Sequence, residues 1–218
     1  MCRTMTPAQI NQRYKGITTR SFQRHMDLFL TAHFLRSSAR ELSHVSAADY
    51  KLFQPSPEEL ALYLQSHQAK SFDSSFGHNS TIRALDDVIK QWWKVVGVEK
   101  GEYEKIHRTH HCISHDDFEA LFSAQTELAC KYCGITENQF KTLIDAGQIQ
   151  TKRLRNRGTT FEIDCREPSL GYTKDNLAIC CYWCNNAKTD EFTEKEFKPV
   201  AKALGLIWQQ RLSALSAT

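Results

Sequence analysis

Apolar residues recur at helical spacing through the first half of the chain. Between residues 20 and 42, apolar side chains stand four apart, at Phe22, Met26, Leu30 and Phe34. After residue 80, a second set recurs at intervals of three and four, at Ile82, Leu85, Val88, Ile89, Trp92 and Val96. The pattern predicts a helical domain over residues 1–112, in which these stripes form the core rather than a ligand site.

Capping residues predict where several of these helices begin and end. Thr6 precedes Pro7, a residue favoured at the first helical position. Ser56 with Glu59 forms a capping box, in which each side chain accepts a hydrogen bond from the backbone N–H of the other residue. Gly97 follows the last apolar position of its pattern and is expected to end that helix.

The second half of the chain alternates shorter helices with strand-like stretches. Thr136 opens a helix that Gly147 closes. Two strand-like stretches then surround a turn near residues 156–158, and a third ends at the second pair of cysteines. A last helix is expected from Thr193 to about Leu204, with Pro199 marking a kink or a restart. The expected fold class is α+β, with a mainly helical N-terminal half and a mixed C-terminal domain over residues 113–218.

Composition excludes several classes of protein. The chain has 218 residues, 41% of them hydrophobic, a net charge of +3 and eight cysteines. There is no run of about 18 apolar residues, so no membrane span is expected. The first residues have no apolar stretch typical of a secretory signal, which predicts a cytoplasmic protein with reduced thiols.

Two CxxC pairs predict a metal site. Cys130 with Cys133 and Cys181 with Cys184 are separated by 47 residues. Each CxxC turn directs two thiolates to one point, and four thiolates complete a closed tetrahedral site for a structural zinc ion. The alternative is a set of buried redox cysteines. Cys180 has the wrong spacing to Cys184 for a zinc knuckle.

Residues 161–188 resemble the motif of the HNH nucleases with flanking zinc knuckles. An apolar stretch ends in Asp164, a Gly-Tyr loop follows, Asn176 opens the next strand, and Asn185 and Lys188 follow the second CxxC pair. The resemblance covers residues 114–200. It implies a ββα-metal module, made of two short strands and a helix, that hydrolyses phosphodiester bonds of nucleic acid, with DNA the expected substrate. It also implies a bacterial restriction or phage-defence setting.

The resemblance assigns roles to these residues. Asp164 and Asn185 would hold a catalytic divalent cation, and carboxylate and amide oxygens are indeed ligands that Mg²⁺ accepts. Asn176 would hold the loop and orient the general base, and Lys188 would face the scissile phosphate. Taken singly, Asp164 could instead cap a turn, and Asn185 and Lys188 could be solvated helix residues.

The sequence departs from the family at the position of the general base. Cys165 stands where the family has His, and all nine histidines lie at or before His115. A thiol with a pKa near about 8.5 is a poor base at neutral pH. The open alternatives are that Cys165 acts as the base, that metal-bound water suffices, that the module binds nucleic acid without cutting, or that one of several earlier histidines supplies the base: His107, His110, His111 or His115.

Basic residues near the motif are candidates for binding nucleic acid. We expect a positive rim at Lys152, Arg153, Arg155, Arg157, Arg166 and Lys174, with Lys141 nearby. The alternative is a solvated hairpin face. A further hypothesis is that the helical half binds a partner protein or a second copy of the chain.

Overall fold

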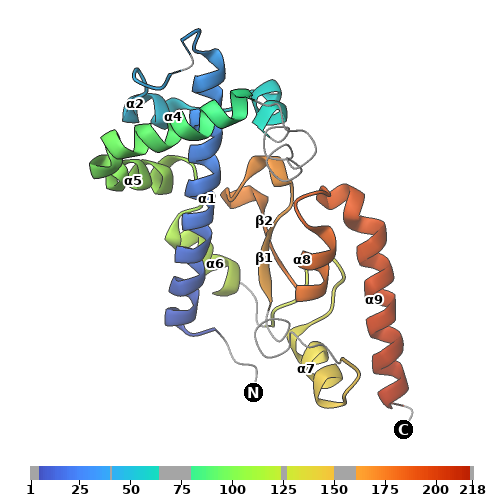
Figure 1. Ribbon diagram of the computed structural model, residues 1–218. Coiled ribbons are helices and arrows are strands. Elements are labelled where there is room, and N and C mark those ends of the chain that lie inside the picture. Colours follow the sequence, from blue (N-terminus) through green and yellow to red (C-terminus); the bar gives the residue numbers. More distant parts are fainter. Residues whose placement is uncertain (1–4, 40, 64–79, 124–126, 150–160, 217–218) are drawn as a thin grey trace. The chain divides into compact units, whose positions relative to one another are not determined.

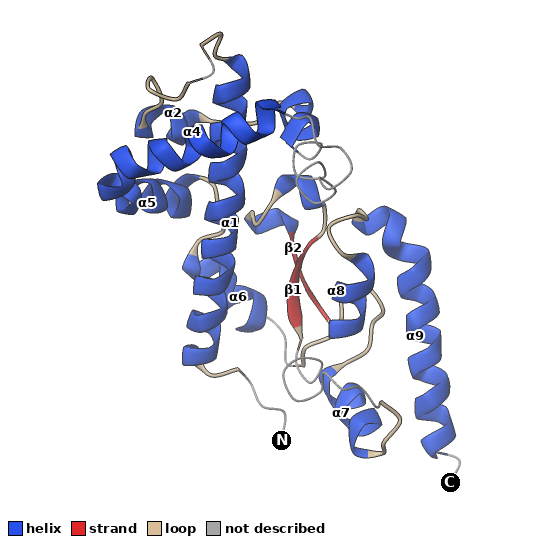
Figure 2. Cartoon of the chain, in the orientation of Figure 1, coloured by secondary structure: helices blue, strands red, loops and turns tan. Residues whose placement is uncertain are grey.

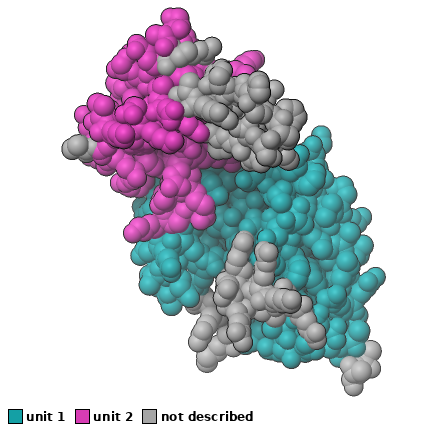
Figure 3. Space-filling model, viewed as in Figure 1, with its two compact units in different colours: residues 1–14, 113–218 teal, residues 15–112 magenta. Residues whose placement is uncertain are grey.

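The chain forms two compact units. The computed structural model groups residues 1–14 with 113–218 in one unit, here called the zinc unit, and residues 15–112 in the other, the helical unit (Figure 3). The first fourteen residues therefore group with the C-terminal part of the chain. The structure describes residues 5–39, 41–63, 80–123, 127–149 and 161–216.

The helical unit contains the helices that the apolar pattern predicts. They are α1 (Pro7–Arg36, whose first residues belong to the zinc unit), α2 (Ala47–Leu52), α4 (Ser80–Val96) and α5 (Lys100–His110), and residues 57–63 are also helical. The core is rich in aromatic side chains, among them Phe29, Phe34, Tyr50, Trp92 and Tyr103. The stripe of α1 is buried in this core, and the described side chains of the α4 stripe lie in it or pack against it, as predicted.

Local capping residues fix the helix ends in the first half of the chain. Helix α1 begins at Pro7, and Thr6 Oγ1 accepts a hydrogen bond from the Gln9 N–H. Ser56 and Glu59 form the predicted capping box, with reciprocal hydrogen bonds of 2.8 and 3.2 Å. Helix α4 ends before Gly97, where a single 3₁₀ turn leads into α5.

The zinc unit combines helices with one β-hairpin (Figure 2). Its helices are α6 (His115–Ser123), α7 (Glu137–Asp145), α8 (Tyr182–Lys188) and α9 (Glu194–Ser216). Strands β1 (Glu162–Cys165) and β2 (Leu177–Cys180) are antiparallel, with Asp164 opposite Ala178. The chain is thus mostly helical, with a C-terminal hairpin followed directly by a helix, and the predicted fold class is confirmed.

Helix α8 packs between the hairpin and α9 (Figure 1). Cys181 caps its first turn, and its length of seven residues takes it only to Lys188. Thr189 then adopts a positive φ of 54°, which turns the chain toward α9. Because the cap of α8 follows β2 directly, the direction of the helix is set by the end of the hairpin.

Helix α9 is longer than the sequence predicts. Thr193 and Glu196 cap its start as expected, with hydrogen bonds of 2.9 and 3.2 Å between each side chain and the other residue's N–H. The expectation that it ends near Leu204 is wrong, since it continues to Ser216 with Pro199 inside. Pro199 lies in an early, exposed turn, whereas Phe197, Ala201 and Trp208 bury one face along the helix and stabilise its full length.

The strand and turn expected near residues 148–158 lie mostly outside the described residues. In the part of the chain that the structure describes, no helix combines the length and apolar character that crossing a membrane requires.

Candidate metal centre and adjacent polar site

Four cysteine side chains from two distant segments converge in the zinc unit. The sulfur atoms of Cys130, Cys133, Cys181 and Cys184 all lie within 4.8 Å of one another, and the Sγ atoms of Cys133 and Cys181 are 3.7 Å apart. Tetrahedral coordination with Zn–S bonds of about 2.3 Å places sulfur atoms about 3.8 Å apart. The cluster therefore fits a zinc ion with four thiolate ligands and no open position.

Tight backbone turns aim these thiols at one point. In the first knuckle, the Gly134 N–H donates to the Cys130 carbonyl at 2.9 Å, and Gly134 has a φ of 76°, which glycine adopts without strain. In the second, Cys181 is the N-cap of α8 and its sulfur accepts from the Cys184 N–H. Hydrogen bonds from the other three thiols, Cys133 first, lower the pKa of Cys130.

The adjacent cysteine is not part of this cluster. Cys180 is fully buried in β2, and burial raises the pKa of its thiol. The cluster contains Cys181 and not Cys180, as the CxxC spacing predicts.

Asp164 lies on the face of β1 that packs against α8. Its carboxylate is 6% exposed, and its Oδ2 atom accepts a hydrogen bond from the Tyr132 hydroxyl. The same oxygen lies 3.1 Å from the Nζ atom of Lys188. Burial raises the pKa of Asp164, while Tyr132 and Lys188 act in the opposite direction. Burial and the bond to Asp164 also raise the pKa of the Tyr132 hydroxyl, so this group stays a hydrogen-bond donor.

Asn185 pairs with a second carboxylate on the same strand. Its Nδ2 atom donates to Oε2 of Glu162, two residues before Asp164. Because strand side chains alternate between faces, Glu162 and Asp164 point to the same side. Asn185 thus contacts Glu162, and Lys188, one turn further along α8, contacts Asp164.

Asn176 closes the loop between the strands. Its Oδ1 atom accepts from the Glu167 N–H at 2.9 Å, and its Nδ2 atom donates to the carbonyls of Glu167 and Gly171 at 2.8 and 2.7 Å. The side chain is 4% exposed and thus satisfies its hydrogen bonds inside the loop. These hydrogen bonds tie the loop together, while the role of Asn176 in orienting a general base stays a prediction.

Lys188 and Cys165 are both buried, contrary to the roles expected of them. The Lys188 side chain is 0% exposed and its Nζ atom donates to the Cys165 carbonyl at 2.7 Å. A buried ammonium group cannot contact a substrate phosphate in this conformation. Lys188 instead stabilises β1 through its hydrogen bond to the Cys165 carbonyl. Cys165 is 5% exposed and follows Asp164, so its side chain lies on the opposite face of the strand from that carboxylate.

The earlier histidines that could supply a base are engaged elsewhere. His107 is buried in the helical unit and bonds Tyr50 and Ser21, at 2.9 and 2.8 Å. His111 bonds the Tyr50 carbonyl in the same unit. His115 bonds Asn11 within the zinc unit, and His110 is exposed at the end of α5. None of the contacts that the described residues make joins these histidines to Asp164 or Asn185.

The expected basic rim is described only in part. Lys152, Arg153, Arg155 and Arg157 lie outside the described residues. Arg166 forms an ion pair with Glu194, and Lys174 forms one with Asp117 at 2.6 Å. Lys141 is exposed on α7. Arg166 and Lys174 are therefore neutralised within the chain, which weakens their case as phosphate ligands.

Two residues at this site were missed in the sequence. Glu162 carried a detectable signal, because it stands two positions before Asp164 and so shares its strand face. Tyr132 carried none, since it reaches Asp164 only through the fold, from between two cysteines of the first knuckle.

Comparison of the chain with models of known families, with curated proteins and with solved structures finds no match. The hairpin, the helix and the four-cysteine cluster are therefore interpreted from their own geometry.

Proposed function

We propose that this protein is a metal-dependent endonuclease of the HNH type, with its site in the zinc unit. The observation that carries the proposal is the hairpin and helix beside the four-cysteine cluster, in which Glu162 of β1 bonds Asn185 of α8 and Asp164, on the same strand face, pairs with Lys188 one turn further along α8. The order of residues resembles the HNH motif, and the loop held by Asn176 supports the same interpretation.

The donor set suits a hard divalent cation such as Mg²⁺. Asp164 and Asn185 would hold it, and Glu162 adds a third oxygen donor next to Asn185. Among the described residues, the contacts of the Asp164 carboxylate are made at Oδ2, so Oδ1 is the oxygen that a cation would take. Bound there, the ion would polarise a phosphate oxygen and lower the pKa of a bound water.

The other residues of the site position these ligands. Tyr132 and Lys188 hold Asp164 in one orientation, and Cys181 fixes the start of the helix that carries Asn185. Cys165 is buried, and His107 and His111 bond Tyr50 within the helical unit. Of the bases that the sequence left open, these contacts favour metal-bound water.

The test is plasmid cleavage in the presence of Mg²⁺, Mn²⁺ or Ni²⁺. We expect Asp164→Ala and Asn185→Ala to reduce the rate at least about a hundredfold, because each removes a ligand of the cation. The control is Asp145→Ala, which removes an exposed carboxylate from α7. Zinc content is measured for each protein, and full activity of zinc-loaded Asp164→Ala would refute the site.

A second candidate function is a nucleic-acid-binding module that no longer cuts. The specific observation in its favour is the closed state of the site, with Asp164 paired to Lys188 and Cys165 buried. Salt-sensitive binding without cleavage in any of the three metals would support it. In that case, cleavage gained by Cys165→His would show that only the base was missing.

The biological setting and the partners are also proposals. The resemblance supports DNA as substrate and a restriction or phage-defence role, and the helical unit would bind a partner protein or a second copy. Sedimentation of the purified chain tests self-association, since a monomer at micromolar concentration would exclude a stable dimer.

A further inference from the structure

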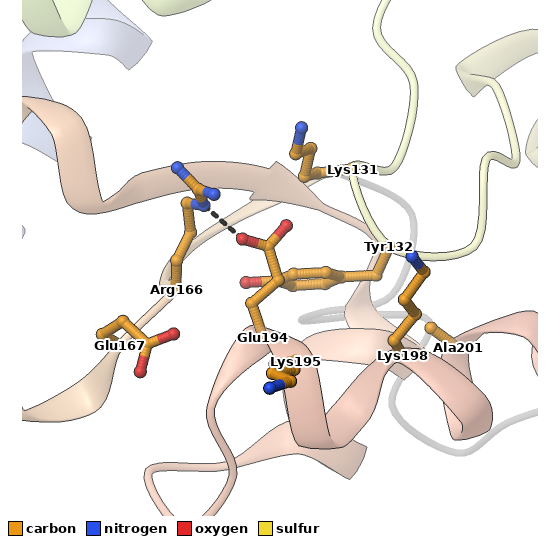
Figure 4. Close-up of a pocket in the computed structure, with 8 residues that line it drawn as sticks. All are labelled: Lys131, Tyr132, Arg166, Glu167, Glu194, Lys195, Lys198 and Ala201. Atoms are coloured by element: carbon orange, nitrogen blue, oxygen red, sulfur yellow. Dashed lines mark hydrogen bonds and ion pairs between the residues drawn. The ribbon is translucent and has the colours of Figure 1, made fainter.

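A cavity of about 490 Å³ lies beside the candidate cation site, within the zinc unit. Three segments line it: Lys131 and Tyr132 of the first knuckle, the end of β1 at Arg166, and the first turns of α9 with Lys195 and Lys198 (Figure 4). Each of these side chains comes from an element that is already fixed by the zinc cluster or the hairpin.

The charges in this cavity are predominantly positive. Four cationic side chains line it against two carboxylates, those of Glu167 and Glu194. Glu194 is neutralised by its ion pair with Arg166 (Figure 4). Lys131, Lys195 and Lys198 are exposed and form no ion pair with any described residue. Three positive charges thus face solvent without an internal partner.

The walls of the cavity are held together by close packing. The Lys131 N–H donates to the Ile179 carbonyl at 2.9 Å, which joins the knuckle to β2. The ring of Tyr132 packs edge-on against Phe197 of α9, with centroids 5.6 Å apart. Further along the helix, Gly205 approaches the Cys133 backbone so closely that a Cβ atom would lie 2.6 Å from its carbonyl oxygen. These contacts fix the backbone from which the three lysines extend.

Tyr132 connects the cavity to the candidate cation site. Its ring lines the cavity, while its hydroxyl donates to Asp164. An anion bound by the lysines would lie next to the residue that holds Asp164 in place.

We propose that this cavity binds the sugar–phosphate backbone of the nucleic-acid strand, with Lys131, Lys195 and Lys198 as its phosphate contacts. The assignment rests on the proposed nuclease function and extends it to residues outside the motif. Lysines bind phosphates as point charges without reading the sequence, so the site would set affinity and position rather than specificity. With Arg166 and Glu194 paired, three lysines and the Glu167 carboxylate remain, so a polyanion would meet a net charge of +2 in the cavity.

The test compares the triple variant Lys131→Ala/Lys195→Ala/Lys198→Ala with the wild type in binding a short fluorescent DNA duplex. We expect affinity at low salt to fall roughly tenfold to a hundredfold, and the slope of log affinity against log salt to shrink by about 2 to 3, close to one unit per phosphate contact. The control is Lys51→Ala/Lys94→Ala/Lys105→Ala, which removes the same charge from exposed sites in the helical unit. Equal loss in both triple variants, or none in the first, would overturn the assignment.

Two further arms separate the possible failures. Polyglutamate is offered as a competitor at the same charge concentration, and competition equal to that of DNA would assign the cavity to an acidic protein instead. Asp164→Ala is expected to abolish cleavage and keep the binding of the wild type. If Asp164→Ala still cuts while the lysine variant fails to bind, the proposed cation site is wrong and the phosphate site stands. If Asp164→Ala is inactive while the lysine variant binds normally, the proposed cation site stands and the phosphate site is wrong.

Discussion

Lys188 and Asp164 form an ion pair whose two side chains are 0% and 7% exposed. Burying two charges is unfavourable unless each is compensated by the other and by hydrogen bonds. Here Tyr132 and the Cys165 carbonyl supply those hydrogen bonds. The pair therefore keeps the candidate ligand Asp164 in place when no cation is bound.

Removing one partner of this pair should be costly. We expect Lys188→Met to lower the free energy of unfolding by about 3 kcal/mol, because it leaves the Asp164 carboxylate buried without its counterion. The double variant Asp164→Asn/Lys188→Met should lose much less than the sum of the two single variants. Urea denaturation of the zinc-loaded proteins gives the three values, and strictly additive effects would contradict a coupled pair.

The sequence singled out Asp164 and Lys188, which the structure pairs, but gave no sign that they bond each other. Asp164, Asn176, Asn185 and Lys188 could be selected because their order along the chain resembles a motif. The burial of Lys188 depends on how α8 packs on β1, and that packing involves residues more than 20 positions apart. A motif carries no information on such exposure.

Helix α9 and the first knuckle meet at a position that admits only glycine. We expect Gly205→Ala to destabilise the zinc unit by about 1–3 kcal/mol, because the added Cβ would lie 2.6 Å from the Cys133 backbone carbonyl, which cannot rotate away. Gly101→Ala in α5 is the matched control, since a Cβ there meets nothing within 4 Å. Thermal unfolding measures both, and an equal effect at the two positions would argue against the close approach.

The two adjacent cysteines at the end of β2 should differ in their effect on metal binding. Cys181→Ser is expected to lower the zinc content of the purified protein well below one ion per chain, because it removes one of four ligands. Cys180→Ala, in the strand itself, should leave the zinc content unchanged. Elemental analysis of both variants decides the point, and zinc loss from Cys180→Ala alone would reassign the ligand.

Helix starts were the most predictable elements, because a cap is a contact between residues three apart. Thr136 and Gln139 exchange the two hydrogen bonds of a capping box. The Ser114 hydroxyl accepts a single hydrogen bond from the Asp117 N–H. The end of α9 was not predictable in this way. Its length depends on Trp208, which packs against Trp183 of α8 and so belongs to the tertiary structure.

For the molecule as a whole, acid and chelators should act on different units. In the helical unit His107 is buried and His25 is half-buried, and this burial lowers the pKa of each to about 3, with His111 adding to the effect. Below about pH 6.5 the unfolded chain takes up protons that these two side chains exclude in the folded state. The free energy of unfolding therefore decreases as the pH is lowered.

We expect each of these two histidines to reduce the free energy of unfolding by roughly 2 kcal/mol between about pH 7 and pH 5. Calorimetry should show the transition of the helical unit moving to lower temperature over this range, and His25→Gln should reduce the shift. A chelator at neutral pH should instead lower the transition of the zinc unit. If acid and chelator lower the same transition equally, the two units do not respond separately.

Tyr132 links the four-cysteine cluster to Asp164. Its backbone belongs to the first knuckle, and its hydroxyl holds Asp164. Until the structural metal is bound, the carboxylate would lack this restraint. We therefore expect loss of metal from the four-cysteine cluster to release the side chain of Asp164 as well as the knuckle itself.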